Sequence, residues 1–191
     1  VDESQLMYPT GWVPKNVPRS TKFTMHSLDQ ALKNSQLPLS SKVAVVLSTT
    51  TSPYELTLSV SDTFRKNKRA MPTKILNCLP DMINYHACTH YGFRGITTTI
   101  TAACATGMTS IDYAMRLVDE YDYVVVGAGD SGVFPDSIKG FEAIGAIGNV
   151  SCPFDNRREG FVMGEGSGVL ILQSDEKVAE FSSVKIAKLY K

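Results

Sequence analysis

A single thiol, Cys104, lies in the run ITAACATGMTS, between a segment rich in β-branched residues and a segment with helical periodicity. The segment before it, residues 96–101, has the composition of a β-strand. We therefore expect Cys104 at a turn where a strand ends and a helix begins. The expected helix is amphipathic, with one buried face formed by apolar residues at steps of three and four, which are Met108, Ile111, Met115 and Val118.

This position gives the Cys104 thiol the surroundings of a nucleophile. Unpaired backbone N–H groups and the positive end of a helix dipole favour the thiolate, the reactive form of cysteine. Small neighbours let a substrate carbonyl approach the sulfur and leave local N–H groups free to hold an oxyanion. The pattern predicts a nucleophile elbow for acyl transfer, whereas a lone cysteine without these neighbours is more often a small buried residue. The small neighbours are Ala102, Ala103, Ala105 and Gly107.

The rest of the chain alternates between strand-like and helix-like segments. Such alternation predicts an α/β domain with a mainly parallel sheet and helices on both faces. In chain order we expect an extended arm over residues 1–20, a helix ending near Asn34, a strand at 43–47, helices at 55–64 and 81–91, the strand at 96–101, the nucleophile helix, and strands at 123–126, 160–172 and 184–189.

Composition excludes several classes of function. The chain has 191 residues, of which 43% are hydrophobic and 20% charged, as in ordinary globular domains. With 19 basic and 19 acidic residues the formal charge is zero, so no overall field attracts nucleic acid or an anionic membrane. No apolar run approaches the roughly 20 residues of a membrane span, and no secretory leader is recognisable. We expect a cytoplasmic protein that binds neither nucleic acid nor membrane.

The remaining cysteines and the histidines predict no second site. Cys78, Cys88 and Cys152 lack paired CxxC spacing, so we expect them to be structural and the compartment to be reducing. His86 and His90 lie four residues apart and share a helix face, but no third metal ligand appears at a suitable spacing. We expect both to pack or to form hydrogen bonds, with no metal and no cofactor, and we expect His26 to cap a helix or face solvent.

Two long motifs resemble those of the β-ketoacyl-acyl carrier protein synthases, or ketosynthases, the condensing enzymes of fatty acid and polyketide synthesis within the thiolase superfamily. TAACATG around Cys104 matches the nucleophile motif of that family, and FDNRREGFVMGEGSG, residues 154–168, resembles its second signature. Residues 84–95 and 123–129 resemble further parts of the family. The resemblance extends over residues 71–173. It implies a thiolase-like fold, of which this chain holds mainly one βαβαβ half with a parallel-rich mixed sheet.

The resemblance also implies which parts of the fold this chain does not contain. The opening strand of the family has no counterpart ahead of Val1, and the second half of the family would begin near Lys191. That half carries two catalytic histidines, a lysine and one oxyanion-hole amide, so the fold is incomplete without it. We expect a single N-terminal-type ketosynthase domain with an arm at 1–20, a core at 21–173, and the start of the next half at 174–191.

The family implies a function for the thiol. Cys104 would accept an acyl group from the phosphopantetheine arm of an acyl carrier protein, for decarboxylative Claisen condensation with a malonyl carrier protein, with histidines supplied by a missing half or a partner chain. Thr51 lies where the family places a residue that gates the acyl tunnel. The basic run at 65–69 is a candidate carrier contact, although such runs are more often solvated helix ends. Asp130 lies near the position of the Gly-Gly-x-Glu turn of the family, and we expect a simple turn substitution.

Two other functions stay open from the sequence. A chain-length-factor-like scaffold would pair with an active ketosynthase and do no chemistry, but such partners usually lack the nucleophile that Cys104 provides. A thiolase-fold acyltransferase without decarboxylation would use the cysteine and need no histidines. In each case we expect a homodimer or heterodimer, because half of a two-half fold exposes an apolar face. The family pairing across a two-fold axis implies a dimer seam at residues 96–101.

Overall fold

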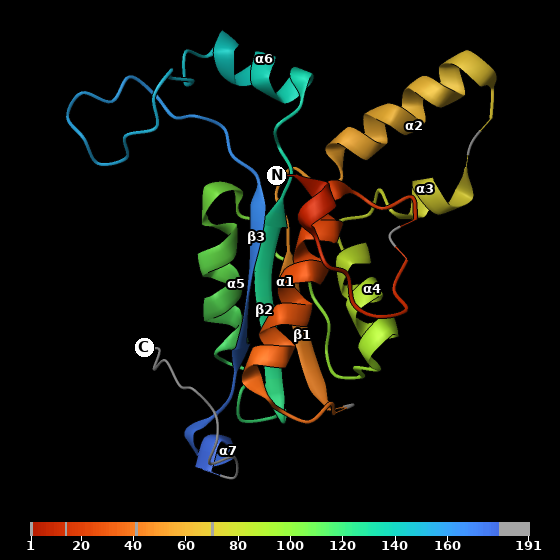
Figure 1. Cartoon of the computed structure of the whole chain (residues 1–191), viewed down its shortest axis with the longest axis vertical. Helices are drawn as coiled ribbons and strands as arrows, with labels where there is room; N and C mark the ends of the chain where they lie inside the picture. The colour runs from red at the N-terminus through yellow and green to blue at the C-terminus, as the bar shows by residue number, and fades with distance from the viewer. Residues whose placement is uncertain (1, 14, 41, 70, 180–191) are drawn as a thin grey trace.

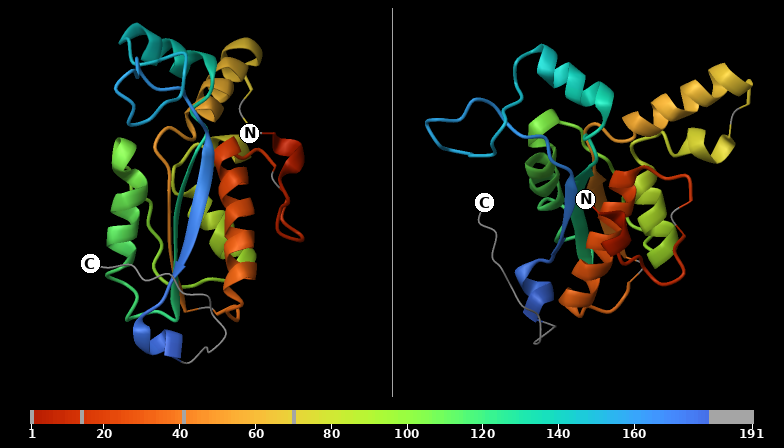
Figure 2. Two further views of the ribbon diagram at one scale, coloured as in Figure 1. Left: turned by 60° about the vertical axis from the view of Figure 1, so that its left-hand side comes forward. Right: turned by 45° about the horizontal axis from the view of Figure 1, so that its top comes forward.

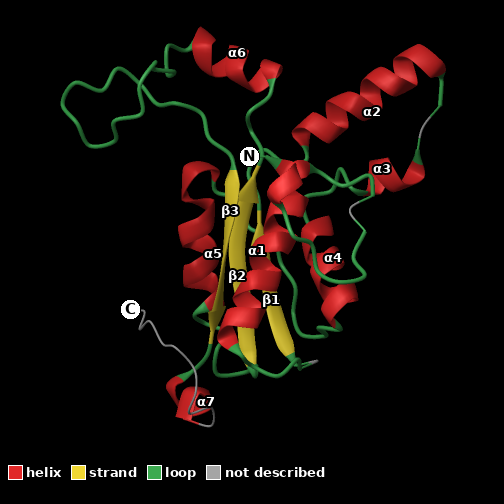
Figure 3. Cartoon of the chain, viewed as in Figure 1, coloured by secondary structure: helices red, strands yellow, loops and turns green. Residues whose placement is uncertain are grey.

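The structure is a computed structural model, which describes residues 2–13, 15–40, 42–69 and 71–179 (Figure 1). At its centre lies a three-stranded sheet in the spatial order β1-β2-β3. β1 runs parallel to β2, whereas β3 runs antiparallel to β2, because the chain leaves the end of β2, passes through the loops above the sheet and returns beside it (Figure 3). The sheet is therefore mixed. Its strands are β1 (Val43–Ser48), β2 (Tyr123–Asp130) and β3 (Gly166–Leu172).

Two layers of helices cover the faces of this sheet, as the alternation of segments predicts. Every residue of β1 is buried, as expected for a continuous apolar run covered on both sides. Figure 2 shows α5 on one side of the strands and α1 on the other. The core next to α1 and α4 contains Met25, Leu28, Ile83, Ala87, Val43, Val45, Leu47 and Val125, and the core next to α5 contains Ala44, Val46, Val124, Val126 and Ala114.

The main predicted helices are present, with shifted ends. α1 starts at Arg19, so the N-terminal arm is slightly shorter than expected. The arm contains one turn of 3₁₀-helix, η1 (Glu3–Gln5). Three short helices were not predicted: α3 (Pro72–Leu76), α6 (Pro135–Ala143) and α7 (Asp175–Ala179). The predicted strand at 184–189 lies outside the described residues. The predicted helices are α1 (Arg19–Ser35), α2 (Tyr54–Asn67), α4 (Met82–Tyr91) and α5 (Thr106–Ala114).

Two predicted strands are shorter than expected. The segment at 160–172 becomes a strand only from Gly166, because the preceding residues lie in a loop above the sheet where they make one isolated bridge, between Phe161 and Ile147. The segment at 96–101 is not a regular strand, and its ladder is reduced to an isolated bridge between Thr97 and Val45.

The side chain of Asn84 explains why the segment at 96–101 stops pairing with β1. Its Oδ1 accepts from the backbone N–H of Leu47 at 2.9 Å, and its Nδ2 donates to the carbonyl oxygens of Leu47 at 3.0 Å and Thr98 at 3.1 Å. These are the groups that a continuing ladder would use. A buried amide from α4 therefore takes the place of the strand pairing, and the segment remains beside β1 in an irregular conformation.

A large part of the chain projects beyond the end of the sheet. We call α2, α3, α6 and the loop at 144–165 the projecting region (Figure 1). None of these three helices has a buried residue. Large apolar side chains lie exposed throughout it, with Phe154 at 99% exposure as the extreme. The others include Phe64, Ile75, Leu76, Ile144 and Val150.

Candidate active site

Cys104 lies in a tight turn between the segment at 96–101 and α5, as the sequence predicts. The turn is a short 3₁₀-helix, η2 (Ala103–Ala105), and α5 begins directly after it. Ala103 has φ of 48°, in the left-handed region that residues with a Cβ rarely adopt. The chain changes direction at this residue, and the Cys104 side chain is exposed to solvent. A buried cysteine is therefore excluded.

The buried face of α5 agrees with the predicted one in part. Ile111, and Val118 beyond the end of the helix, pack against the core as predicted, whereas Met108 does not. Small residues face the sheet at steps of four, Thr106, Ser110 and Ala114, whereas Met108 is 73% exposed. The prediction for Met108 was wrong because α5 is attached to β1 partly through hydroxyl groups. The Ser110 hydroxyl donates to the Thr106 carbonyl at 2.7 Å, and its oxygen lies 2.8 Å from the Ser48 hydroxyl oxygen.

Hydrogen bonds fix the peptide between Ala103 and Cys104. The Ala103 carbonyl accepts from the Thr106 hydroxyl at 2.8 Å and from the Thr106 backbone N–H. In a trans peptide the N–H points opposite to the C=O, so the Cys104 N–H points away from these donors. Within the described residues this N–H donates no hydrogen bond. It is a free donor beside the thiol, as an oxyanion site requires.

Asp130, at the carboxyl end of β2, binds the loop at 49–52. Its carboxylate accepts from the backbone N–H groups of Thr50 at 3.0 Å, Thr51 at 3.1 Å and Ser131 at 3.1 Å, and from the Thr51 hydroxyl. A simple turn substitution was therefore the wrong expectation. The available signal was the position of Asp130 directly after a buried strand, where functional groups of α/β sheets gather.

Thr50, rather than Thr51, connects this loop to the nucleophile turn. The Thr50 hydroxyl lies 3.2 Å from the Ala103 carbonyl, to which it donates, and 3.1 Å from the Thr106 hydroxyl. Thr51 is half-buried with its hydroxyl on Asp130. The structure thus brings the loop and the nucleophile turn together, whereas the side-chain hydroxyl of Thr51 is bound to Asp130. Sequence reasoning missed Thr50 because its partners are distant in the chain.

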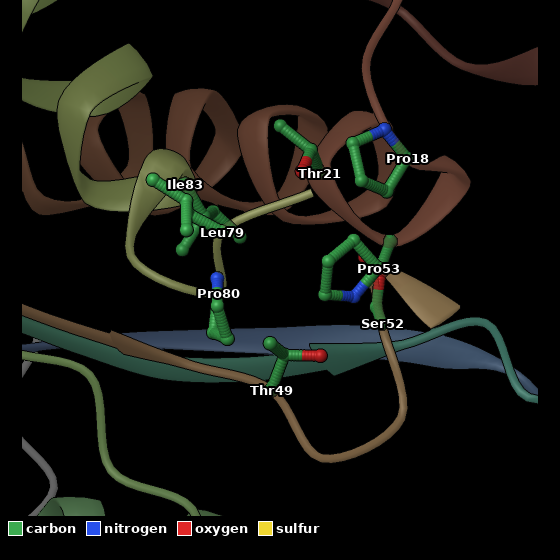
Figure 4. Close-up of a pocket in the computed structure, with 9 residues that line it drawn as sticks. Pro18, Thr21, Thr49, Ser52, Pro53, Leu79, Pro80 and Ile83 are labelled. Atoms are coloured by element: carbon green, nitrogen blue, oxygen red, sulfur yellow. The ribbon is translucent and has the colours of Figure 1, made fainter. Parts of the chain in front are cut away.

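A small hollow lies on the other side of the loop, toward α1 and α4. Figure 4 shows Ser52 and Pro53 on one side of it, Leu79, Pro80 and Ile83 on the other, and Thr49 below them. Thr49 is only 4% exposed, and its hydroxyl has no hydrogen-bond partner among the described residues. The two faces of the loop therefore have different neighbours: Thr50 hydrogen-bonds the nucleophile turn, and Thr49 lines the hollow.

The histidines make structural contacts away from the nucleophile turn. His86 lies 2.8 Å from the Asn77 side-chain oxygen, and burial lowers its pKa. The His90 ring packs edge-on against Tyr91, so the prediction of packing and hydrogen bonding is confirmed for both. His26 Nδ1 lies 3.0 Å from the Met7 backbone nitrogen and 2.8 Å from the Met7 carbonyl oxygen, so this half-buried ring holds the N-terminal arm, and the expected helix cap is absent from its described contacts.

The other ionisable groups give no second site. In the described part of the chain no cluster of three or more histidine, cysteine or acidic side chains is placed to hold a metal. Cys88 packs against the main core, and burial raises the pKa of its thiol. No helix among the described residues is long and apolar enough to cross a membrane. The nucleophile turn is therefore the strongest candidate for chemistry.

Comparison with known proteins identifies the class to which this fold and turn belong. The sequence matches the family described as "Beta-ketoacyl synthase, N-terminal domain" over residues 13–178, which is most of the chain. The chain therefore belongs to this family, as the motifs around Cys104 indicate.

Individual relatives agree with the family. The chain is 32% identical over 127 residues to the 3-oxoacyl-[acyl-carrier-protein] synthase homolog of Saccharomyces cerevisiae, an alignment that covers 64% of this chain and 29% of that protein. It is 35% identical over 122 residues to the mitochondrial 3-oxoacyl-[acyl-carrier-protein] synthase of Arabidopsis thaliana, with 59% of this chain and 26% of that protein covered. The alignments thus reach less than a third of the length of these relatives.

Solved structures show the same fold. A ketosynthase from a type II polyketide synthase, in complex with its acyl-carrier protein, matches with a TM-score of 0.78 at 23% identity, covering 88% of this chain and 46% of that one. The ishigamide ketosynthase/chain length factor matches with a TM-score of 0.68 at 18% identity, covering 92% of this chain and 48% of that one. The predicted thiolase-like fold is confirmed, and the chain spans about half of each solved structure.

Proposed function

We propose that this chain is the acyl-accepting part of a β-ketoacyl synthase, with Cys104 as the catalytic residue. The observation that carries the proposal is an exposed thiol in the nucleophile motif of the family, beside a backbone N–H with no acceptor among the described residues. The expected substrate is an acyl thioester on the phosphopantetheine arm of an acyl carrier protein. The chain acts as a single N-terminal-type domain with its core at residues 21–173.

The acyl transfer proceeds by addition and elimination at the thioester carbonyl. The Cys104 thiol gives its proton to solvent, and the thiolate forms a C–S bond to the carbonyl carbon as the C=O electron pair moves to oxygen. The Cys104 N–H donates to this oxyanion. The C=O then reforms and the bond to the carrier arm breaks. The arm leaves as a thiolate, which takes a proton from solvent, so charge and protons balance.

Condensation needs groups that this chain does not supply at the nucleophile turn. In the ketosynthases a malonyl carrier loses CO₂, and the resulting carbanion attacks the acyl-cysteine to form the new C–C bond and release the Cys104 thiolate. The histidines of the described chain lie elsewhere, on Met7, Asn77 and Tyr91. We infer that a C-terminal half or a partner chain provides the decarboxylation step.

We further propose a carrier contact, a dimer and a cellular location. A solved neighbour of this chain is a ketosynthase bound to its acyl-carrier protein. An acidic carrier fits the basic run at 65–69, which begins in the last turn of α2, within the projecting region. The segment at 96–101 is the proposed dimer seam, Thr51 the proposed gate of the acyl tunnel, and the cytoplasm the proposed location.

A non-catalytic scaffold is the second candidate, because one structural neighbour is a ketosynthase/chain length factor pair. A scaffold needs no exposed thiol at the start of α5, so the exposure of Cys104 favours the catalytic function. The third possibility, an acyltransferase without decarboxylation, shares the first chemical step with the ketosynthase and differs in the second. Acylation of Cys104 therefore distinguishes the scaffold from the ketosynthase, and decarboxylation of a malonyl carrier distinguishes the plain acyltransferase from it.

The test is acylation measured by intact mass. The chain is mixed with an acyl thioester of an acyl carrier protein, and we expect a mass gain of one acyl group that disappears in Cys104→Ala. Cys152→Ser is the matched control, since it removes a cysteine outside the nucleophile turn and should leave the mass gain unchanged. No gain in the wild type would support the scaffold. Release of CO₂ from malonyl carrier protein after addition of a C-terminal half then separates the ketosynthase from the plain acyltransferase.

A further inference from the structure

We propose that Thr50, held in place by Asp130, is a positioning residue for acyl transfer to Cys104. In this proposal the Thr50 hydroxyl sets the orientation of the peptide between Ala103 and Cys104 and so aims the Cys104 N–H at the oxyanion. The proposal rests on the proposed function only in taking Cys104 as the residue that becomes acylated.

The first step is the attachment of Thr50 to the sheet. Its backbone N–H donates to Asp130 Oδ2 at 3.0 Å, and the neighbouring Thr51 donates to the same carboxylate through both its N–H and its hydroxyl. Asp130 is the last residue of β2, a strand that is buried along most of its length. Hydrogen bonds to a charged acceptor are stronger than those between neutral groups, so this carboxylate fixes the loop to a rigid element.

The second step is the contact between the loop and the nucleophile turn. The Thr50 hydroxyl donates to the Ala103 carbonyl at 3.2 Å and lies 3.1 Å from the Thr106 hydroxyl. The Thr106 hydroxyl donates to the same carbonyl and accepts from the Ala102 N–H at 2.9 Å. Two hydroxyls from different elements thus hold one carbonyl, and Thr106 is buried whereas Thr50 is exposed.

The third step is the effect on the donor. Because the C=O and the N–H of a trans peptide point in opposite directions, fixing the Ala103 carbonyl fixes the Cys104 N–H. The Ala103 backbone is in the left-handed region, with φ of 48°, a conformation that persists only when surrounding contacts maintain it. Without the Thr50 hydroxyl, only the hydroxyl and the backbone N–H of Thr106 hold the carbonyl, both from the start of α5, and the direction of the Cys104 N–H is fixed less firmly.

The proposal is tested by comparing two reactions of the same sulfur. Alkylation by iodoacetamide needs an accessible thiolate and forms no oxyanion, whereas acylation by a small thioester such as S-phenyl thioacetate passes through one. Both rates are read from the mass of the proteolytic peptide at 95–116, which contains Cys104 as its only cysteine. The readout is the ratio of the acylation rate to the alkylation rate, which a change in thiol exposure alone does not move.

The variants test the contribution of the Thr50 hydroxyl separately from that of the Asp130 carboxylate. In Thr50→Val the backbone bond to Asp130 stays and the hydroxyl is lost, so we expect the ratio to fall about tenfold, less than the roughly 100-fold or more that follows removal of an oxyanion donor. Thr50→Ser restores the hydroxyl and should restore the ratio. Asp130→Asn should lower the ratio in the same direction. Thr63→Val is the control, because the Thr63 hydroxyl donates only within the exposed helix α2.

Each outcome decides the inference. A ratio that falls in Thr50→Val and recovers in Thr50→Ser supports it, provided that both variants melt at the wild-type temperature. An unchanged ratio in Thr50→Val, or an equal fall in Thr63→Val, overturns it. If the wild type reacts with S-phenyl thioacetate but takes no acyl group from a carrier protein, the proposed function fails, while the comparison of Thr50 variants still decides the positioning role.

Discussion

The central sheet buries most of its apolar side chains, whereas the projecting region leaves many of its own exposed. In β1 every side chain is covered by α1 and α4 on one face or by α5 on the other. In α2, α3 and α6 no residue is buried, and the loop beside them exposes Phe154 almost completely. The nucleophile turn is connected to β2 through Thr50, which contacts both the Ala103 carbonyl and Asp130, and the helix that follows it is connected to β1 through Ser110 and Ser48.

This contrast indicates which part of the chain can fold from contacts within the chain alone. A monomer rarely leaves a large continuous apolar surface in water, so exposed apolar side chains on helices without a buried face indicate a missing partner. The chain spans about half the length of its solved neighbours. We infer that the sheet folds from its own contacts, whereas the projecting region is completed by another part of a ketosynthase or by another chain.

The largest expected effect comes from placing one charge in each region. Val125→Asp introduces a carboxylate at a site with 0% exposure, so we expect a loss of about 4 kcal/mol or more in the free energy of unfolding. Phe154→Asp places the same group at a site with 99% exposure, so the change should stay within about 0.5 kcal/mol. Urea denaturation followed by circular dichroism measures both. Equal losses would contradict the division into two regions.

An intermediate effect is expected at Asn84, which links α4 to the edge of β1. In Asn84→Leu the amide is lost, so the Leu47 N–H and the Thr98 C=O lose their partner, while the Leu47 C=O keeps the Thr99 hydroxyl. We expect a loss of about 2–4 kcal/mol, since each buried polar group left unpaired costs roughly 1–3 kcal/mol. Asn67→Leu, at the exposed end of α2, is the control and should be nearly neutral. A neutral Asn84→Leu would show that the side-chain amide does not hold the segment at 96–101.

The smallest expected effect concerns how the stability of the contact between α4 and the end of α3 depends on pH. His86 on α4 hydrogen-bonds Asn77, the residue after α3, and burial lowers the pKa of His86. The unfolded chain therefore binds a proton more readily than the folded one, and the stability that His86 contributes is lost as the pH falls below about 6.5. We expect His86→Gln to flatten the decline in melting temperature between pH 7 and pH 5. An unchanged slope would assign the decline to other groups.

Local sequence patterns were enough for much of the fold. The continuous apolar runs of β1 and β2 and the helical periods of α1, α2 and α4 depend on neighbours a few residues apart, and the structure contains all of them. The small residues around Cys104 predict a tight turn at a helix start, and the turn is present. The family follows from two contiguous motifs for the same reason, since each is read without knowing what lies across the molecule.

Contacts between residues far apart in the sequence determined the features of the fold and the site that local patterns did not predict. Asn84 lies 37 residues from Leu47 and ends the pairing of a segment whose composition favours a strand. Asp130 lies 80 residues from Thr50, and only the sheet brings the carboxylate to that loop. The exposed Met108 likewise reflects the small residues with which α5 approaches β1. The sequence by itself determined the elements and the nucleophile because these depend on local spacing. The tertiary structure decided which groups position that nucleophile, because hydrogen bonds between remote segments form only after packing has placed them side by side.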